Sequence, residues 1–392
     1  MDDTDLVVIG GGIVGLMTAY YASRQGKKVV LFERYFCGTQ EGSSAEHVRM
    51  WRTMYTELNH SKLAYESGDL FREIERESQS TLMVQRGLLN FGVETEYTPE
   101  GTLLSPIKTM EQLGKRYLVL TRDEIHDRYP FKNLPDNYIG IFQEDNAVID
   151  VKKSISITLS LCLRHGVKVR QDTAAMGVRN YPEGVVVDTS KGEVRAKKLV
   201  IAAGPFTNQI LRTSFDQELD LLIWDMCFSY YRLNDPARQY PMWFQFDVAK
   251  NGYSNLFYGF PNVEFGRKDF IRVAVDWASH TFHDVDKREY VPRRLDIKLT
   301  QEFVQDHMVG VDKAPIDAGT ALMAHLPDNL SVLDYLPSDI PNNKNVVVCC
   351  AGWAFKFAPL FGKLCANLAF EQKVAHDINE FSIERPRVLK RV

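Results

Sequence analysis

The first 33 residues show a regular change of hydrophobic pattern. A run of apolar residues at 6–9 leads into three glycines with the spacing GxGxxG, an amphipathic stretch follows, and a second apolar run at 29–32 ends at Glu33. Short apolar runs are typical of buried strands, and clustered glycines mark a tight turn. The pattern predicts a strand, a turn, a helix and a second strand parallel to the first.

The same pattern analysis extends along the rest of the chain. The longer predicted elements are helices at 58–77, 151–165 and 359–370 and buried strands at 199–204 and 345–352. A β pair at 184–198 precedes the first of these strands. Residues 217–320 are rich in aromatic, strand-like runs, which suits a sheet that covers a pocket.

We therefore predict an α/β fold with two domains. The first is a Rossmann-type dinucleotide-binding domain assembled from residues 1–83, 148–216 and 322–392. The second is an α+β substrate domain with a mixed β-sheet, formed by residues 84–147 and 217–321. A chain of 392 residues is long enough for two domains with a large core.

The glycine motif has a chemical reason. Gly10 allows the sharp turn, Gly12 lets a pyrophosphate approach the backbone, and Gly15 lets the helix pack closely on the strand. Glu33 lies where a carboxylate can accept both hydroxyls of an adenosine ribose, which disfavours the 2′-phosphate of NADP. The motif opens the chain and no second glycine fingerprint follows, which favours tightly held FAD over NAD.

Composition argues against several other classes of function. The formal net charge is −4 without a long basic run, so no nucleic-acid partner is expected. No stretch approaches the roughly 18 apolar residues of a membrane span, and the acidic first residues differ from a signal peptide. The six cysteines show no paired spacing, which fits a reducing compartment. We expect a cytoplasmic protein.

One short spacing suggests a metal site. His280 and His283 are three residues apart, but no third ligand lies at a useful distance along the sequence. Acidic residues beside such a pair are common on loops, so we expect no metal.

Several short motifs occur in order along nearly the whole chain. After GxGxxG and Glu33 come Gly42-Ser43, the string RMWR ending at Arg52, the string YGFP beginning at Tyr258 and the string WAFKFAPLFG beginning at Trp353. This order resembles the monomeric sarcosine oxidase family of FAD-dependent amine oxidases. Within that family it is most similar to the branch that oxidises a cyclic imino acid, piperideine-2-carboxylate, in nikkomycin biosynthesis.

The resemblance implies a fold and a reaction. The fold would be of the D-amino-acid-oxidase kind, and the protein a monomer that acts in secondary metabolism. The substrate would be a small amino acid or cyclic imino acid, and a hydride would pass from the carbon next to nitrogen to flavin N5. O2 would serve as the electron acceptor and yield hydrogen peroxide.

The resemblance also assigns substrate-binding residues. Arg52 and Lys356 match the two cations that hold the substrate carboxylate, a task to which the bidentate fork of arginine is suited. Residue type alone allows simpler roles, since Arg52 could pair with a surface acid and Lys356 could cap a helix. Trp353 could stack on a planar substrate ring or be an ordinary core tryptophan.

Other residues match positions near the reacting atoms. Arg49, three residues before Arg52 and so expected on the same helical face, matches an arginine near the flavin ring. Tyr258 and Asp276 fall in strands that line the family's pocket, where they could assist proton movement or satisfy a buried donor. Arg272 falls where the sarcosine oxidases have a lysine that promotes reaction with O2. Glu100 is a further pocket candidate that could equally be an exposed loop acid.

Cofactor contacts are expected around the glycine turn, after the first and second strands, and after the two later buried strands. The expected residues are Gly10, Gly12, Ile13, Val14, Gly15, Glu33, Arg34, Ser43, Ser44, Arg49, Met176, Ala203, Gly204, Gly352, Trp353, Phe355 and Lys356.

The family's covalent flavin link is not expected. It uses a cysteine about thirteen residues before the acid of a short strand, and residues 319–323, counted back from Asp334, contain none. Cys349 and Cys350 lie on a different predicted strand, and His47 is offset by one residue from the loop position of histidyl links. We expect non-covalent FAD.

Three other functions stay open from the sequence. One is oxidation of an N-methyl amino acid of the sarcosine type. A second is a flavin monooxygenase, which would require NAD(P)H. A third is a flavoprotein without catalysis that acts as a binding partner.

Overall fold

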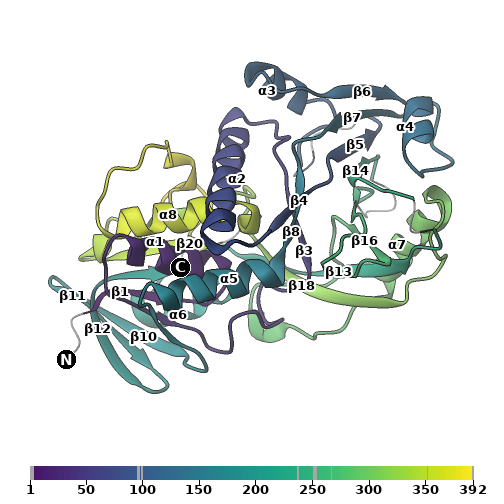
Figure 1. Cartoon of the computed structure of the whole chain (residues 1–392). Helices are drawn as coiled ribbons and strands as arrows, with labels where there is room; N and C mark the ends of the chain where they lie inside the picture. Colours follow the sequence, from purple (N-terminus) through teal and green to yellow (C-terminus); the bar gives the residue numbers. More distant parts are fainter. Residues whose placement is uncertain are drawn as a thin grey trace.

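The computed structural model of the protein describes residues 4–94, 98, 100–235, 238–249, 254–265, 267–350 and 352–390. The strands of this part of the chain form two large sheets and one small sheet (Figure 1). Helices α1, α2, α5 and α8 gather on the first large sheet, and the second sheet lies beside it with α7 at its far end.

The first sheet is built around β1 (Thr4–Ile9). This strand pairs in parallel with β2 (Val29–Phe32) on one side and with β12 (Gly192–Ile201) on the other, so that Val8 lies between Leu31 and Val200. All three of these side chains are fully buried. The predicted strand, turn, helix and parallel strand are therefore present.

The remaining strands of this sheet extend it on both sides. They are β9 (Lys168–Arg170), β10 (Ala175–Tyr181), β11 (Gly184–Thr189), β19 (Val332–Tyr335) and β20 (Val346–Cys350). The expectation of a β pair followed by a separate strand is wrong in one respect. β12 is continuous because its first half pairs with β11 and its second half with β1 and β20.

Four helices cover one face of this sheet. They are α1 (Ile13–Arg24), α2 (Leu58–Ser78), α5 (Val151–Arg164) and α8 (Ala358–Ala369). The predicted helices agree with the last three of these to within one residue at each end. α1 and α8 approach closely because Gly362 has no side chain; a Cβ there would overlap Met17 of α1. Apolar side chains of the opposite face pack on α6 (Thr207–Phe215).

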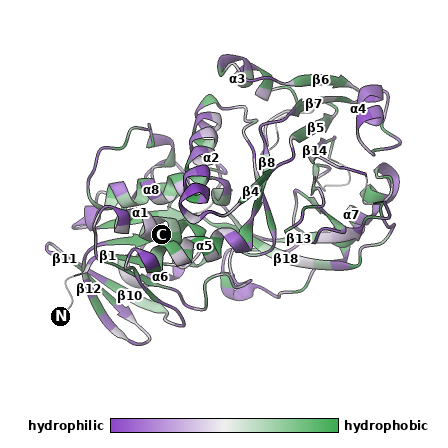
Figure 2. Ribbon diagram, viewed as in Figure 1, coloured by the Kyte–Doolittle hydropathy of each residue, from purple (hydrophilic) through white to green (hydrophobic). Residues whose placement is uncertain are grey.

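The second large sheet contains nine strands among the described residues. They are β5 (Leu88–Gly92), β6 (Leu118–Thr121), β7 (Ile139–Gln143), β13 (Leu222–Arg232), β14 (Met242–Phe246), β15 (Phe257–Phe260), β16 (Phe270–Val275), β17 (Thr281–Phe282) and β18 (Asp317–His325). Helices α3 (Pro106–Gln112) and α4 (Arg122–Arg128) lie at one end, and α7 (Arg294–His307) stacks Phe303 on Trp243 of β14 at 4.9 Å. In Figure 2 the strands β5 and β14 are mostly green, whereas α4 is purple.

The predicted division into two domains remains a proposal. β18 runs across the predicted boundary between residues 321 and 322, because it pairs without interruption along β13 from Leu222 to Tyr230.

A small sheet of β3 (Val48–Trp51), β4 (Met83–Gln85) and β8 (Ala147–Asp150) lies between the two large sheets. Arg49 is on β3, so the expected helical face shared with Arg52 is wrong: residues 48–51 pair with β8 as a strand.

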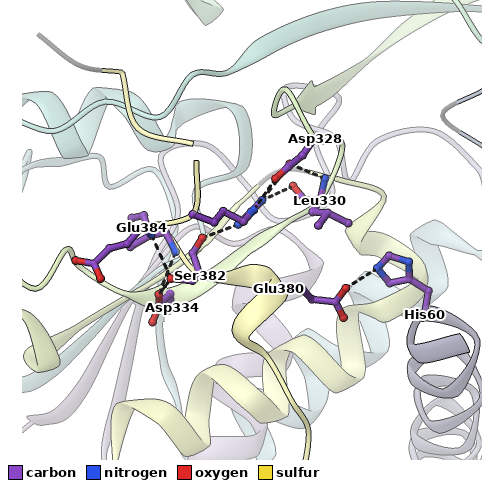
Figure 3. A network of polar contacts seen from close by, with 9 residues as sticks. His60, Asp328, Leu330, Asp334, Glu380, Ser382 and Glu384 are labelled. Carbon is purple, nitrogen blue, oxygen red and sulfur yellow. Dashed lines mark hydrogen bonds and ion pairs between the residues drawn. The ribbon is translucent and has the colours of Figure 1, made fainter. Parts of the chain in front are cut away.

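The last residues described are tied back onto the first sheet (Figure 3). The carboxylate of Asp334, on β19, accepts hydrogen bonds from the Ser382 hydroxyl and the Ile383 backbone N–H. Arg385 donates to Asp328, and Glu380 lies 3.6 Å from the ring of His60 at the start of α2. These contacts fix residues 380–385 against α2 and β19.

The contact of α1 with β1 gives a direct test of the fold. A Cβ at Gly15 would overlap the carbonyl oxygen of Gly10, and backbone cannot move aside cheaply. We predict that Gly15→Ala lowers the free energy of unfolding by about 1–3 kcal/mol, measured by denaturant titration. Gly177→Ala on β10 is the control, because a Cβ there meets only Asp188 at 3.9 Å. Equal stability of the two variants would contradict the close packing.

Candidate active site

One long cavity lies between the two large sheets. Its walls run from the glycine turn and Glu33, at the carboxyl ends of β1 and β2, to Asp276 and Lys356. The carboxyl ends of parallel strands are the usual site of ligands in such sheets. The cavity therefore joins the predicted nucleotide end to the predicted substrate end.

The nucleotide end is shaped by glycines. Gly10 has φ +111°, and a Cβ there would overlap the carbonyl of Ala202 at the end of β12. Gly12 is the N-cap of α1, and the N–H of Ile13 donates to Ser44 Oγ at 3.1 Å. The free N–H groups of a helix start attract negative charge. The turn therefore has the geometry of a phosphate-binding site.

Glu33 is held in place by backbone groups. One carboxylate oxygen accepts the N–H of Gly11 at 2.6 Å, and the other accepts the N–H of Tyr35 at 2.8 Å. A carboxylate can accept about four hydrogen bonds, so this one keeps capacity for two ribose hydroxyls.

Most of the predicted cofactor contacts lie on the cavity wall. These are Gly10, Gly12, Ile13, Val14, Glu33, Arg34, Ser43, Ser44, Arg49, Ala203, Gly204, Gly352, Trp353, Phe355 and Lys356. Gly15 lies behind the turn, where it packs α1 on β1. Met176 does not fit its prediction: its side chain is 61% exposed, and its neighbour Ala175 lines the cavity instead. Met176 lies at a register shift of β10 between Ala175 and Gly177, where the regular alternation of side chains is interrupted.

The substrate end contains a buried ion pair. Arg52 pairs with Glu100, and the two side chains are 3% and 4% exposed. The Arg52 guanidinium also lies 4.4 Å from the ring of Tyr55 and 5.4 Å from the ring of Phe244. The simpler interpretations of Arg52 and of Glu100 are therefore wrong. Arg52 pairs with a buried acid and not with a surface acid, and Glu100 is not an exposed loop residue.

Lys356 faces the same end of the cavity. It lies in the short helix η4 (Ala354–Phe357), and its Nζ is 5.5 Å from the rings of Tyr55 and Trp353. Burial and the positive charge of Arg52 hold the pKa of Lys356 well below its ordinary value. Glu100 and Asp276 oppose this shift by favouring the charged form.

Asp276 follows β16 and is buried beside these groups. Burial and the negative charge of Glu100 raise its pKa to about 7, against the opposing charges of Arg52 and Lys356. The carboxyl can therefore exchange a proton near neutral pH. Two cations and two acids thus meet at one end of the cavity.

A second pair of arginines lines the middle of the cavity. Arg49 donates to the carbonyl oxygens of Val48 at 2.8 Å and Ser43 at 3.0 Å. Burial and the nearby Arg272 lower its pKa. Arg272 is buried, lies 5.7 Å from the Tyr258 ring and pairs with Glu46 at 3.2 Å. Burial raises the pKa of the Tyr258 hydroxyl.

The sequence did not reveal several residues that line the cavity or contact its side chains. Phe244, Tyr55 and Glu46 contact the arginines of the site, and His325 packs against Trp353 with ring centroids 5.9 Å apart. Phe244 belonged to the aromatic region expected to cover a pocket, but its direction could not be read from that pattern. The other three carry no motif that would have marked them.

Comparison with known proteins bears directly on this cavity. The family model for FAD-dependent oxidoreductases (DAO) matches residues 5–368. The chain belongs to this family. It is also similar to the solved structure of NikD, named as an unusual amino acid oxidase essential for nikkomycin biosynthesis. The TM-score is 0.91 at 31% sequence identity, over 97% of this chain and 98% of that one.

Two curated relatives support the same class of enzyme. Monomeric sarcosine oxidase from Bacillus sp. (strain B-0618) is 27% identical over 398 residues, covering 97% of this chain and 96% of the relative. A Dictyostelium discoideum protein assigned as a bifunctional amine oxidase is 38% identical over 405 residues. The matched region covers 98% of this chain but only 37% of that longer protein. The chain is thus an FAD-dependent amine or amino acid oxidase, an oxidoreductase that acts on CH–NH groups.

The residues present fit the FAD that this oxidoreductase requires. The glycine turn leaves room for a pyrophosphate where a Cβ on Gly12 would lie only 3.2 Å from Ser44 Oγ. Glu33 would hold the adenosine ribose, and the helix start would face the phosphates. The predicted cofactor is confirmed by family membership.

The two thiols on the described cavity wall, those of Cys349 and Cys350, both have hydrogen-bond partners. Ala321, Leu322 and Met323 of β18 line the cavity in the segment where relatives would carry a cysteine. From β20, Cys350 donates to the Gly204 carbonyl at 3.2 Å. The hydrogen bond with Cys365 and burial raise the pKa of Cys349 well above its ordinary value. These features are consistent with non-covalent FAD.

Two further observations concern the described residues alone. They contain no group of three or more His, Cys, Asp or Glu side chains arranged to hold a metal ion. None of their helices is long and apolar enough to cross a membrane.

The glycine turn makes a prediction about cofactor binding. Gly12→Val would place two methyl groups beside Ser44, in the space expected for the pyrophosphate. We predict a folded protein that is purified colourless, with the flavin absorbance lost and the circular dichroism spectrum kept. Gly177→Val, at a residue that does not line the cavity, is the control. A yellow Gly12→Val protein with the normal flavin content would contradict the assigned phosphate site.

The raised pKa of Asp276 makes the stability of the protein depend on pH. Its pKa is raised from 3.8 to about 7 on folding, so its contribution to stability is complete below pH 4 and is lost as the pH rises through 7. Asp276→Asn keeps a neutral side chain and should gain stability relative to the parent between pH 5 and 8. Each pKa unit corresponds to about 1.4 kcal/mol, so we expect a gain of roughly that size or more. A difference in stability that does not change with pH would contradict the raised pKa.

Proposed function

We propose that this enzyme oxidises a small amino acid or cyclic imino acid at the carbon next to nitrogen. The observation that carries this proposal is the meeting of Arg52, Lys356, Glu100 and Asp276 at one end of the cavity. An amino acid carries one anionic and one basic group. Two cations and two acids in a buried site complement both groups at once.

Arg52 and Lys356 would hold the substrate carboxylate. Arg52 has five N–H donors in a planar fork, and its pairing with Glu100 leaves others for a second carboxylate. An incoming carboxylate would also favour the charged form of Lys356, whose pKa is lowered in its absence. The rings of Tyr55 and Phe244 lie over the guanidinium, with centroids 4.4 Å and 5.4 Å from its central carbon, and limit the space in which it can move.

Asp276 and Glu100 would manage the nitrogen and its proton. With a pKa of about 7, Asp276 can take a proton from an ammonium or iminium group, leaving the nitrogen lone pair free. Bound FAD supplies the redox chemistry by accepting a hydride from the adjacent carbon. We propose O2 as the electron acceptor and hydrogen peroxide as its product, with Arg49 and Arg272 supplying positive charge in the cavity.

A flat, cyclic substrate suits the aromatic walls. Trp353 lines the cavity, and His325 packs edge-on against it at 5.9 Å between ring centroids. A planar ring gains most from stacking on such a surface. The likeness to NikD supports this choice, whereas the weaker likeness to monomeric sarcosine oxidase supports an N-methyl amino acid as the competing substrate.

The carboxylate clamp can be tested by substitution. We predict that Arg52→Ala and Lys356→Ala each lower kcat/KM for carboxylate substrates by about 100-fold or more, while FAD stays bound. A cyclic amine without a carboxylate is the matched control substrate, and its oxidation should be affected far less. Equal losses on the acid and the amine would show that the two side chains do not act as a carboxylate clamp.

The substrate class is tested by anaerobic titration of the yellow enzyme. We predict that a cyclic imino acid bleaches the flavin absorbance, and that N-methylglycine does so more slowly. Faster bleaching by N-methylglycine would favour the sarcosine-type alternative. Bleaching by NADPH alone would favour a monooxygenase, and no bleaching by any amine would contradict the proposal.

A further inference from the structure

Glu46 has an unusual backbone conformation. Its φ is +79°, in the left-handed region that residues other than glycine rarely adopt. Such a conformation costs about 1 kcal/mol or more and persists where the surroundings require it, often at functional sites. Its side chain is 3% exposed, so a charged group has been buried at a strained position.

The carboxylate of Glu46 has partners on two strands of the second sheet. Its Oε2 lies 3.2 Å from Nε of Arg272, on β16, and its Oε1 accepts a hydrogen bond from the hydroxyl of Tyr230, on β13. Burial would favour the neutral acid, but the charge of Arg272 and the Tyr230 hydroxyl keep the pKa of Glu46 below its ordinary value. The group is an anion in the folded protein.

Arg272 has aromatic, hydroxyl and acidic neighbours, and Glu46 is the acidic one. The guanidinium carbon of Arg272 lies 4.6 Å from the ring of Phe228 and 5.1 Å from the ring of Phe260. Within the described part of the chain, Glu46 supplies its only ion pair. The aromatic faces and the neighbouring Tyr258 hydroxyl attract the guanidinium but carry no full negative charge, so Glu46 is the group that compensates its charge.

The ion pair also separates two cavities. Arg272 lines the long cavity, whereas Glu46 and Tyr230 line a second, smaller cavity with Lys152 and Arg267. Glu46 thus reaches Arg272 from the side of the second cavity, while Arg272 itself lines the long cavity.

We infer that Glu46 is a positioning residue, which fixes the Arg272 guanidinium on the cavity wall and offsets part of the positive charge that Arg49 and Arg272 place there. The inference rests on the proposed function, in which these cations act on the electrons of the bound flavin and on O2. The strained backbone at residue 46 follows from this role, because it turns the carboxylate toward Arg272.

Glu46→Gln tests the role, since it removes the charge and keeps the shape. The variant lacks the negative charge of Glu46, so the reduced flavin is stabilised relative to the oxidised flavin. We therefore predict a more positive midpoint potential of the bound flavin. We also predict that O2 reoxidises the dithionite-reduced enzyme about tenfold more slowly, because Arg272 loses the anion that orients its guanidinium. Tyr230→Phe, which removes only the hydroxyl, should shift both quantities in the same direction by less.

Asp225→Asn is the matched control. Asp225 and Arg288 form an equally buried pair, with side chains 1% and 3% exposed, and neither lines the long cavity. This variant should lose thermal stability and keep the potential and the reoxidation rate. If Glu46→Gln and Tyr230→Phe behave like it, Glu46 is merely structural and the inference is overturned. Reduction by dithionite needs no amino acid, so the result is independent of whether the proposed substrate class holds.

Discussion

The parallel pairing of β1 with both β2 and β12 is the constraint on which the rest of this structure depends. Parallel strands end at the same edge of a sheet, so this pairing brings the glycine turn, Glu33 and Gly204 together from three parts of the chain. Pairing of β20 with β12 adds the segment that carries Lys356 to the same edge. The second sheet then closes the cavity from the other side.

The charged groups of the cavity are explained better by chemistry than by stability. Taking an ion out of water costs several kcal/mol, and a buried pair often recovers no more than this cost. The cavity nevertheless buries Arg52, Lys356, Arg272, Glu100 and Asp276. Such a cluster needs a reason beyond folding, and an amino acid substrate and a redox cofactor together provide one.

Local patterns predicted the parts of the fold that local physics determines. The glycine turn and Glu33 act within one strand–helix–strand unit, so they were visible in the sequence. The pairing of Arg52 with Glu100 was not, because 47 residues lie between them and the loop of Glu100 is placed by tertiary packing. Arg49 was expected on a helix because its spacing from Arg52 fits one, and only pairing with β8 makes that segment a strand. Glu46 carries no motif, and its strain appears only in three dimensions.

The most direct test of the account is a crystal structure of the FAD-bound enzyme with a non-reacting aromatic carboxylate, such as pyrrole-2-carboxylate, in the cavity. We predict that the ligand carboxylate lies between Arg52 and Lys356, with its ring against Trp353. A carboxylate bound elsewhere, with Arg52 paired to Glu100 alone, would contradict the proposed clamp.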